Sequence, residues 1–213
     1  MMKIIFTILL MIFAITTAHA DIDALLAKDF PGWDIDHQVT GNLDGDNTPD
    51  AAAVIWQQPK DEESRGNALL VVYLNGKLHT KAENAICIGC GGPKASFDQP
   101  LGTLKITDKG LLTVSYSGGA RSMYDIVMKW RLDKPADKFL LIGESTTTTD
   151  TLGEYPEEFM DINYSTLNAS RRTGKKTVTC PVSPQQKLQE LSGFDYYEKH
   201  GNDIEAINAA CPK

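Results

Sequence analysis

Short apolar runs and alternating segments between residues 51 and 180 predict a series of β-strands. The clearest alternation lies in residues 123–132, where every second residue is apolar and Asp125, Lys129 and Arg131 occupy positions between them. Such a pattern is typical of an antiparallel strand with one buried face and one solvent-exposed face. The predicted buried face consists of Tyr124, Ile126, Met128, Trp130 and Leu132.

Further strands are predicted where apolar or β-branched residues are bounded by turn-forming residues. Asn75-Gly76 is a strong hairpin signal, and Asp108-Lys109-Gly110 predicts another turn. Because the strands are short and no long helix separates them, we expect a mainly β fold of the α+β type, built as an antiparallel sheet assembly. These further strands cover residues 51–57, 68–74, 104–107, 111–117 and 138–148.

Helical patterns occur near the two ends of the exported part of the chain. Residues 21–30 place apolar side chains at helical spacing, and Pro31-Gly32 ends this short N-terminal helix. Near the other end, Ser183, Pro184 and Gln186 provide a cap, a first-turn proline and a capping-box glutamine.

The C-terminal helical pattern continues in two steps. Gly193 ends the helix that begins after Ser183, and Asn202 opens another helix. We therefore expect a β-rich domain over residues 21–178 and a small, disulfide-linked helical appendage over residues 179–213.

Residues 1–20 have the pattern of a secretory signal peptide. Lys3 provides the positive start, Ile4–Ile15 is almost entirely apolar, and Ala18-His19-Ala20 matches the small-x-small cleavage pattern. The apolar run is shorter than the roughly 20 residues that span a bilayer. We expect cleavage after Ala20 and a periplasmic or secreted protein without a membrane anchor.

The charge balance narrows the classes of partner. Cleavage removes Lys3 from the 21 basic residues, which leaves 20 against 28 acidic residues and a net charge of −8. Nucleic acids and anionic membrane surfaces require clustered lysine and arginine, so neither is expected as a partner.

All four cysteines lie in the exported part of the chain. An even number of cysteines in an oxidising compartment predicts disulfides, and four cysteines allow three pairings. We favour Cys87 with Cys90 and Cys180 with Cys211, because each of these pairs brackets one local segment.

The segment GNLDGDNTPDAAAVI, residues 41–55, carries the clearest candidate for a metal site. Oxygen-bearing side chains fall at positions 1, 3, 5 and 9 from Asn42, and the residue at position 7 can add its backbone carbonyl. Calcium favours six to eight such oxygen ligands. The alternative is a metal-free turn, because Asp, Asn, Gly and Pro form turns in any case. The candidate ligands are Asn42, Asp44, Asp46, Thr48 and Asp50.

This loop differs from an EF-hand, because position 12 is Ala53 and the following segment is β-like. It resembles the calcium loops of FG-GAP and VCBS repeats, which are best known from the β-propeller blades of integrins. Asn42 stands where those loops have aspartate, and Asn47 stands where they have glycine. The resemblance implies calcium held by the candidate ligands, in a structural role because little coordination would stay open. A single copy cannot form a propeller.

A longer resemblance covers residues 41–178. The single aspartate loop, the C-x-x-C-G-G segment, the strands of residues 102–145 and the late TGKK are similar to a family of exported bacterial β-rich proteins. This resemblance implies an exported β-rich domain with one FG-GAP/VCBS-type loop, and it assigns no activity.

Candidate catalytic groups are few. Cys87 and Cys90 have the spacing of thiol–disulfide oxidoreductases, but no helix pattern follows them, so a structural disulfide is preferred. A zinc site would need two further ligands nearby. The histidines His37, His79 and His200 are not at metal-ligand spacing.

Two other charged segments are candidates for chemistry. Arg121, beside a glycine-rich turn, could bind an anion. An acidic patch around Tyr155 and Pro156 could supply the two opposed carboxylates of a glycosidase, although a solvated loop is the simpler interpretation. The patch comprises Glu154, Glu157, Glu158 and Asp161.

The sequence therefore leads to two hypotheses. The preferred one is a periplasmic, calcium-stabilised interaction protein that binds a protein of the cell envelope, such as an immunity protein or an inhibitor of an envelope enzyme. The alternative is an exported hydrolase or a thiol–disulfide redox protein that uses Cys87 and Cys90.

Overall fold

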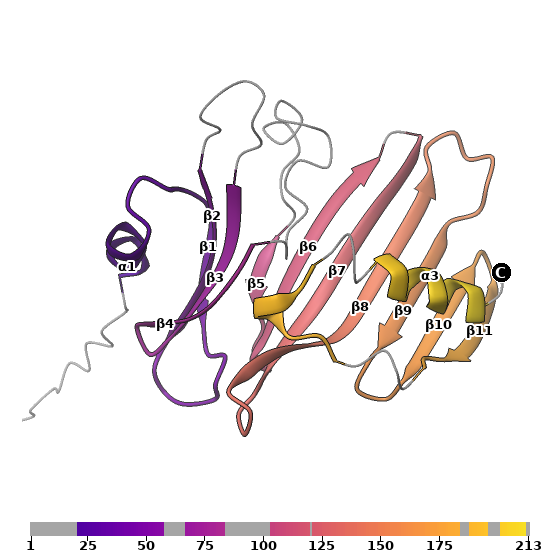
Figure 1. Cartoon of the computed structure of the whole chain (residues 1–213). Helices are drawn as coiled ribbons and strands as arrows, with labels where there is room; N and C mark the ends of the chain where they lie inside the picture. The colour runs from indigo at the N-terminus through magenta and orange to yellow at the C-terminus, as the bar shows by residue number, and fades with distance from the viewer. Residues whose placement is uncertain are drawn as a thin grey trace, which may run out of the picture.

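The computed structural model describes residues 21–57, 67–83, 103–119, 121–183, 188–195 and 201–211. Two antiparallel sheets make up most of this part, which confirms the predicted mainly β fold (Figure 1). The smaller sheet has four strands in sequence order: β1 (Asp34–Gly41), β2 (Asp50–Gln57), β3 (Asn67–Leu74) and β4 (Lys77–Ala82).

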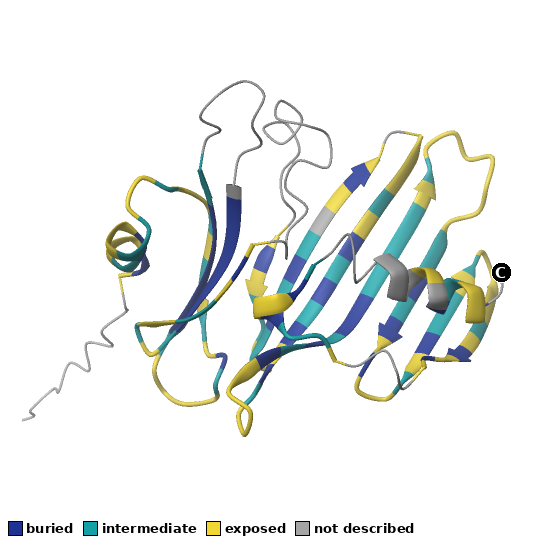
Figure 2. Ribbon diagram, viewed as in Figure 1, coloured by how far each residue is buried: buried dark blue, intermediate teal, exposed yellow. Residues whose placement is uncertain are grey.

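The larger sheet has seven strands, and each strand pairs with its neighbours in sequence. The strands are β5 (Leu104–Ile106), β6 (Leu111–Gly119), β7 (Ser122–Asp133), β8 (Lys138–Asp150), β9 (Glu158–Asn163), β10 (Asn168–Thr173) and β11 (Lys176–Pro181). Buried residues alternate with more exposed ones along most of these strands, and β7 shows the alternation that its apolar periodicity predicts (Figure 2). Trp130, on the predicted buried face of β7, is fully buried.

The short N-terminal helix α1 (Ile22–Asp29) confirms the prediction for residues 21–30. The side chain of Asp21 caps the helix by accepting from the backbone N–H of Ala24 at 3.3 Å. Ile22 and Leu26 are buried against one face of the smaller sheet. At the end of the helix, the hydroxyl of Tyr73 donates to Asp29 at 3.1 Å and ties α1 to β3.

Strand β2 is buried on both faces because it lies between α1 and the larger sheet. Ala53 and Ile55 contact the cluster beneath α1, whereas Ala52 and Val54 join the main core shared by both sheets. The two sheets approach closely at Gly41, where a Cβ atom would lie 2.5 Å from Cγ2 of Ile106. The uninterrupted apolar sequence of β2 therefore reflects packing on two sides.

Strands β3 and β4 form the hairpin predicted from Asn75-Gly76. Both turn residues have positive φ angles, 52° and 71°, as a two-residue type I′ turn requires. The hairpin places His79 in β4.

The C-terminal segment packs over the buried face of the larger sheet. Helix α3 (Gly201–Ala210) confirms the helix predicted to open at Asn202, and Ile207 is buried in the main core. Phe194 packs edge-on against Trp130 with ring centroids 4.9 Å apart. The segment thus completes the same core that the two sheets form.

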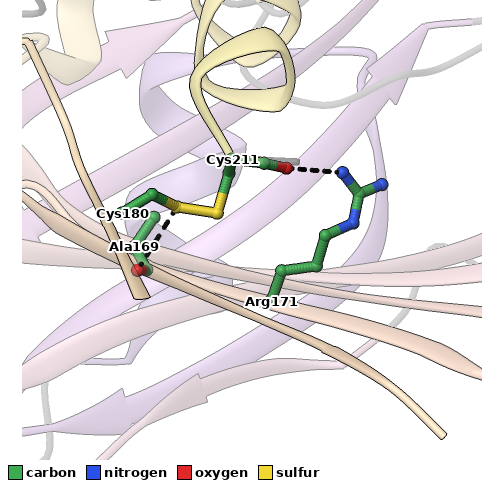
Figure 3. The surroundings of a disulfide bond; sticks show 4 residues. All are labelled: Ala169, Arg171, Cys180 and Cys211. Carbon is green, nitrogen blue, oxygen red and sulfur yellow. Dashed lines mark hydrogen bonds between the residues drawn. A yellow bond between two sulfur atoms is a disulfide. The ribbon is translucent and has the colours of Figure 1, made fainter. Parts of the chain in front are cut away.

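The disulfide between Cys180 and Cys211 joins β11 to the end of α3, with Cα atoms 5.3 Å apart (Figure 3). The guanidinium of Arg171, on β10, donates to the backbone carbonyl of Cys211 at 3.0 Å beside the disulfide. This confirms one of the two predicted pairings. Cys87 and Cys90 lie outside the described residues, as do residues 1–20 with the predicted signal peptide.

The helix predicted from Ser183 to Gly193 is wrong for residues 188–193. Glu190 forms an isolated antiparallel bridge with Leu140, and the N–H of Leu141 donates to the carbonyl of Gln189 at 2.9 Å. A short 3₁₀ turn, η1 (Leu191–Gly193), follows. Pairing with β8 has therefore overridden the local helical pattern. Residues 184–187 of this prediction lie outside the described part.

Within the described residues, no helix has the length and apolar character needed to cross a membrane.

Candidate functional site

The aspartate loop connects β1 to β2, and Asp50 holds it together. This carboxylate is 1% exposed and accepts from the backbone N–H groups of Leu43 at 2.7 Å, Asp44 at 3.2 Å and Asn75 at 3.1 Å. Burial raises the pKa of Asp50 above its usual value, and the three N–H donors partly offset that rise. Asp50 therefore links the two ends of the aspartate loop and also ties this loop to the β3–β4 turn.

The other candidate ligands form a ladder of local hydrogen bonds. The backbone N–H of Asp46 donates to Asp44 at 2.9 Å, and that of Thr48 donates to Asp46 at 2.5 Å. The side-chain oxygen of Asn42 accepts from the N–H of Gly45 at 2.5 Å, and its amide donates to the carbonyl of Asp46. These are side-chain turns of the kind that Asn and Asp form readily.

The donor set fits calcium in type and spacing. Asn42, Asp44, Asp46 and Asp50 supply only oxygen ligands, the kind calcium prefers, from a single turn. Their arrangement is less suitable, because the oxygens face backbone N–H groups and no three acidic, histidine or cysteine side chains in the described residues are grouped to hold a metal.

The aspartate loop borders a pocket of about 540 Å³ at the end of the molecule where three turns meet. The β3–β4 turn contributes Lys77, and the β7–β8 turn contributes Lys134 and Asp137. His79, also in the pocket wall, pairs through Nε2 with Asp137 at 3.0 Å and packs edge-on against Phe139. His79 thus joins the two sheets, because it lies on β4 of the smaller sheet and pairs with the β7–β8 turn of the larger sheet.

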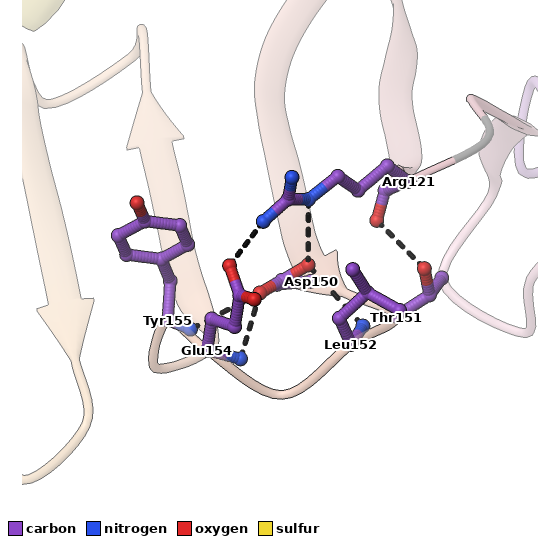
Figure 4. Close-up of polar contacts among 6 residues, drawn as sticks. All are labelled: Arg121, Asp150, Thr151, Leu152, Glu154 and Tyr155. Carbon is purple, nitrogen blue, oxygen red and sulfur yellow. Dashed lines mark hydrogen bonds and ion pairs between the residues drawn. The ribbon is translucent and has the colours of Figure 1, made fainter.

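A second candidate site lies on the loop between β8 and β9 (Figure 4). The carboxylate of Asp150 accepts from three backbone N–H groups of this loop: Leu152 at 3.3 Å, Glu154 at 2.8 Å and Tyr155 at 3.1 Å. The loop is therefore folded around one carboxylate, in the same way as the aspartate loop is folded around Asp50.

Arg121, from the β6–β7 turn, fixes this loop from outside. Its guanidinium pairs with Glu154 and lies 3.8 Å from Asp150, and its backbone carbonyl accepts from both the N–H and the hydroxyl of Thr151. The anion that Arg121 binds in this structure is therefore supplied by the protein itself.

The loop presents two large apolar side chains to solvent. Leu152 is 64% exposed and Tyr155 is 69% exposed, the highest values among the large apolar residues in the described part of the chain. Tyr155 also lines a pocket of about 560 Å³, together with Pro156, Thr148, Thr173, Arg121, Asp150 and Glu158. We call Leu152, Tyr155 and this pocket the β8–β9 surface.

The acidic patch predicted around Tyr155 is electrically compensated. Each of its carboxylates has a cationic partner: Glu154 with Arg121, Glu157 with Arg172, Glu158 with Arg171 and Asp161 with Lys129.

The strand geometry also separates two of these carboxylates. Because residues alternate along a strand, Glu158 and Asp161 of β9 point to opposite faces of the larger sheet. These two groups therefore do not form the opposed pair that a glycosidase needs.

The remaining candidates add no second cluster. His37 pairs with its neighbour Asp36 at 3.0 Å on the exposed edge strand β1. His200, Cys87 and Cys90 lie outside the described residues.

The sequence patterns did not indicate Asp150, Leu152 or Lys134 as site residues. For Asp150 a signal exists in the segment DTLGE, since an aspartate that ends a strand just before a glycine commonly folds a turn around its carboxylate. No local signal identifies Lys134, because its neighbours in the pocket are distant in sequence.

Comparison of the chain with protein-family models, with curated protein sequences and with solved structures gives no match.

Proposed function

We propose that this chain is an exported interaction protein that binds a protein of the cell envelope through the β8–β9 surface. The observation that carries the proposal is an ordered loop that presents its two most exposed apolar side chains to solvent. A loop already fixed by Asp150 and Arg121 loses little conformational freedom on binding, which favours affinity. Tyrosine in such a position is a common anchor of protein interfaces.

The charge of the molecule favours a basic partner. The exported chain has a net charge of −8, so a partner with a positive surface would be attracted and oriented during encounter. An immunity protein or an inhibitor of a basic envelope enzyme fits this description. The disulfide between Cys180 and Cys211 is compatible with an oxidising compartment such as the periplasm.

We further propose that the aspartate loop binds one calcium ion in a structural role. Its side-chain ligands would be Asn42, Asp44, Asp46 and Asp50, with the backbone carbonyl of Thr48. Two observations support this proposal. All candidate ligands are oxygens, and Asp50 already holds the loop closed through hydrogen bonds to the N–H groups of Leu43 and Asn75.

The test begins with capture of a partner from periplasmic extract, followed by affinity measurements with the purified partner. Tyr155→Ala and Leu152→Ala should each weaken binding by about tenfold or more, the loss typical of a buried anchor. Ile35→Ala is the matched control, because Ile35 is also exposed but lies on β1 of the smaller sheet.

Wild-type affinity in Tyr155→Ala and Leu152→Ala would contradict the proposed surface. Thiol–disulfide exchange activity that disappears in Cys87→Ser would favour the redox alternative over an interaction protein.

A further inference from the structure

Lys134 reaches the aspartate loop from the other sheet. It begins the β7–β8 turn of the larger sheet, yet its Nζ lies 3.3 Å from the position that a Cβ atom would take on Gly45. Gly45 stands between Asp44 and Asp46, two of the proposed calcium ligands. The ammonium group therefore lies beside the part of the loop that carries these two residues.

The backbone of the β7–β8 turn is fixed in this position. His79 holds Asp137 at 3.0 Å, and the N–H of Asp137 donates to the carbonyl of Lys134 at 3.3 Å. The ring of His79 in turn packs edge-on against Phe139, with centroids 5.4 Å apart. Lys134 thus extends toward the loop from an anchored turn.

Lys134 interacts with the loop through space. Although Nζ lies close to Gly45, no carboxylate in the described part of the chain lies within 4.0 Å of it. Lys134 therefore forms no salt bridge with a described carboxylate. Lys134, Asp44 and Asp46 line the same open pocket, where water and salt screen their charges. The interaction is expected to be modest and strongly dependent on ionic strength.

We propose that Lys134 is a built-in counter-ion of the aspartate loop, which stabilises the ion-free loop and competes with a divalent cation for it. This inference rests on the calcium site proposed above. In the ion-free loop the ammonium offsets the mutual repulsion of Asp44 and Asp46. A bound divalent cation would repel the same ammonium, so Lys134 lowers the affinity of the loop for calcium.

The expected size of the effect follows from Coulomb's law. A divalent ion and an ammonium group several ångströms apart in water repel each other enough to change a binding constant by about five- to tenfold. The repulsion should fall strongly between low salt and about 1 M salt, because the screening length shortens from tens of ångströms to about 3 Å.

The experiment measures thermal stability of the full exported chain in chelator and across a calcium titration, at low and at high salt. At low salt, Lys134→Met should bind calcium about five- to tenfold more tightly than wild type and should melt at a lower temperature in chelator. Lys134→Arg keeps the charge and should resemble wild type in both measurements. High salt should remove most of the difference.

Two controls separate this effect from a general change in charge. Lys77→Met alters another lysine of the same pocket, which does not approach Gly45, and should change the calcium affinity less. Lys175→Met removes a charge from the exposed β10–β11 turn of the larger sheet and should leave the affinity unchanged.

The outcomes distinguish the two proposals. Equal calcium affinity in wild type and Lys134→Met would overturn the competition while leaving the calcium site intact. Equal stability of these two proteins in chelator would overturn the counter-ion role. If Lys134→Met, Asp44→Ala/Asp46→Ala and wild type all fail to respond to millimolar calcium, the calcium site itself is wrong and the competition falls with it.

Discussion

Asp50 and Asp150 serve their loops in the same way. Each carboxylate accepts three backbone N–H groups, so one side chain satisfies donors that would otherwise need water. Asp50 is almost fully buried, with 1% of its surface exposed, and this desolvation raises its pKa. At both positions the carboxylate is first of all a structural group.

At the residue scale, Asp50→Asn should lower the free energy of unfolding by about 1–3 kcal/mol. Both oxygens of Asp50 accept backbone N–H groups. Asparagine replaces one oxygen with an NH₂ group, so at least one backbone N–H would face a donor in place of an acceptor. Because burial raises the pKa of Asp50 above 3.8, the folded protein takes up this proton before the unfolded chain does as the pH falls. The contribution of Asp50 to the free energy of unfolding is therefore greatest in acid, and it decreases as the pH rises through the raised pKa.

The measurement is urea unfolding of wild type and Asp50→Asn at several pH values. The difference between their unfolding free energies should widen as the pH is lowered from about 6 to about 4. A difference that narrows toward acid would contradict the assignment of the raised pKa to Asp50.

At the scale of elements, strand β11 and helix α3 depend on each other through the disulfide. Cys180 and Cys211 are both buried, and the bond closes a segment with a sequence separation of 31 residues. Arg171 adds a hydrogen bond to the carbonyl of Cys211, and an ion pair to Glu158, at the same junction. The end of α3 is therefore held by a covalent bond and by a partly buried arginine.

The double variant Cys180→Ala/Cys211→Ala should lose about 3–4 kcal/mol of stability, the loss expected when a loop of this length is no longer closed. Calorimetry gives the change in melting temperature, and amide exchange should increase first in residues 205–211. A melting temperature equal to that of wild type would show that the disulfide adds little to packing around Ile207.

At the scale of the whole molecule, one core joins both sheets and the C-terminal segment. Leu70 and Val72 of the smaller sheet pack in the same cluster as Trp130 of the larger sheet and Phe194 of the C-terminal segment. The smaller sheet is also covered by α1 on its other face. Neither sheet could therefore unfold without exposing core residues of the other.

This shared core predicts a single cooperative unfolding transition. Trp130 reports on the larger sheet, whereas Trp33 and Trp56 report on the region of the smaller sheet. In Trp130→Phe, and separately in Trp33→Phe/Trp56→Phe, the midpoint by fluorescence should equal the midpoint by far-ultraviolet circular dichroism. Different midpoints within one variant would indicate that the sheets unfold independently.

Much of the fold could be predicted because its signals are local. The alternation in β7, the Asn75-Gly76 turn and the α1 pattern each depend on a few consecutive residues. The helix expected to end at Gly193 failed because pairing of Glu190 with Leu140 competed with the local preference. For the candidate sites, the sequence identified the aspartate loop but missed the exposed Leu152.

The sequence by itself determined strands β2, β3 and β5–β8, the buried face of β7, the Asn75-Gly76 turn and the group of oxygen-bearing side chains in the aspartate loop. Steric preferences and side-chain periodicity act over a few residues, and these features follow from them. Only the tertiary structure decided which groups neutralise one another. Arg121 pairs with Glu154, His79 with Asp137, and Lys134 reaches Gly45, although the members of each pair are far apart in the chain. Such contacts arise when sheets pack and turns converge, so no local pattern contains them.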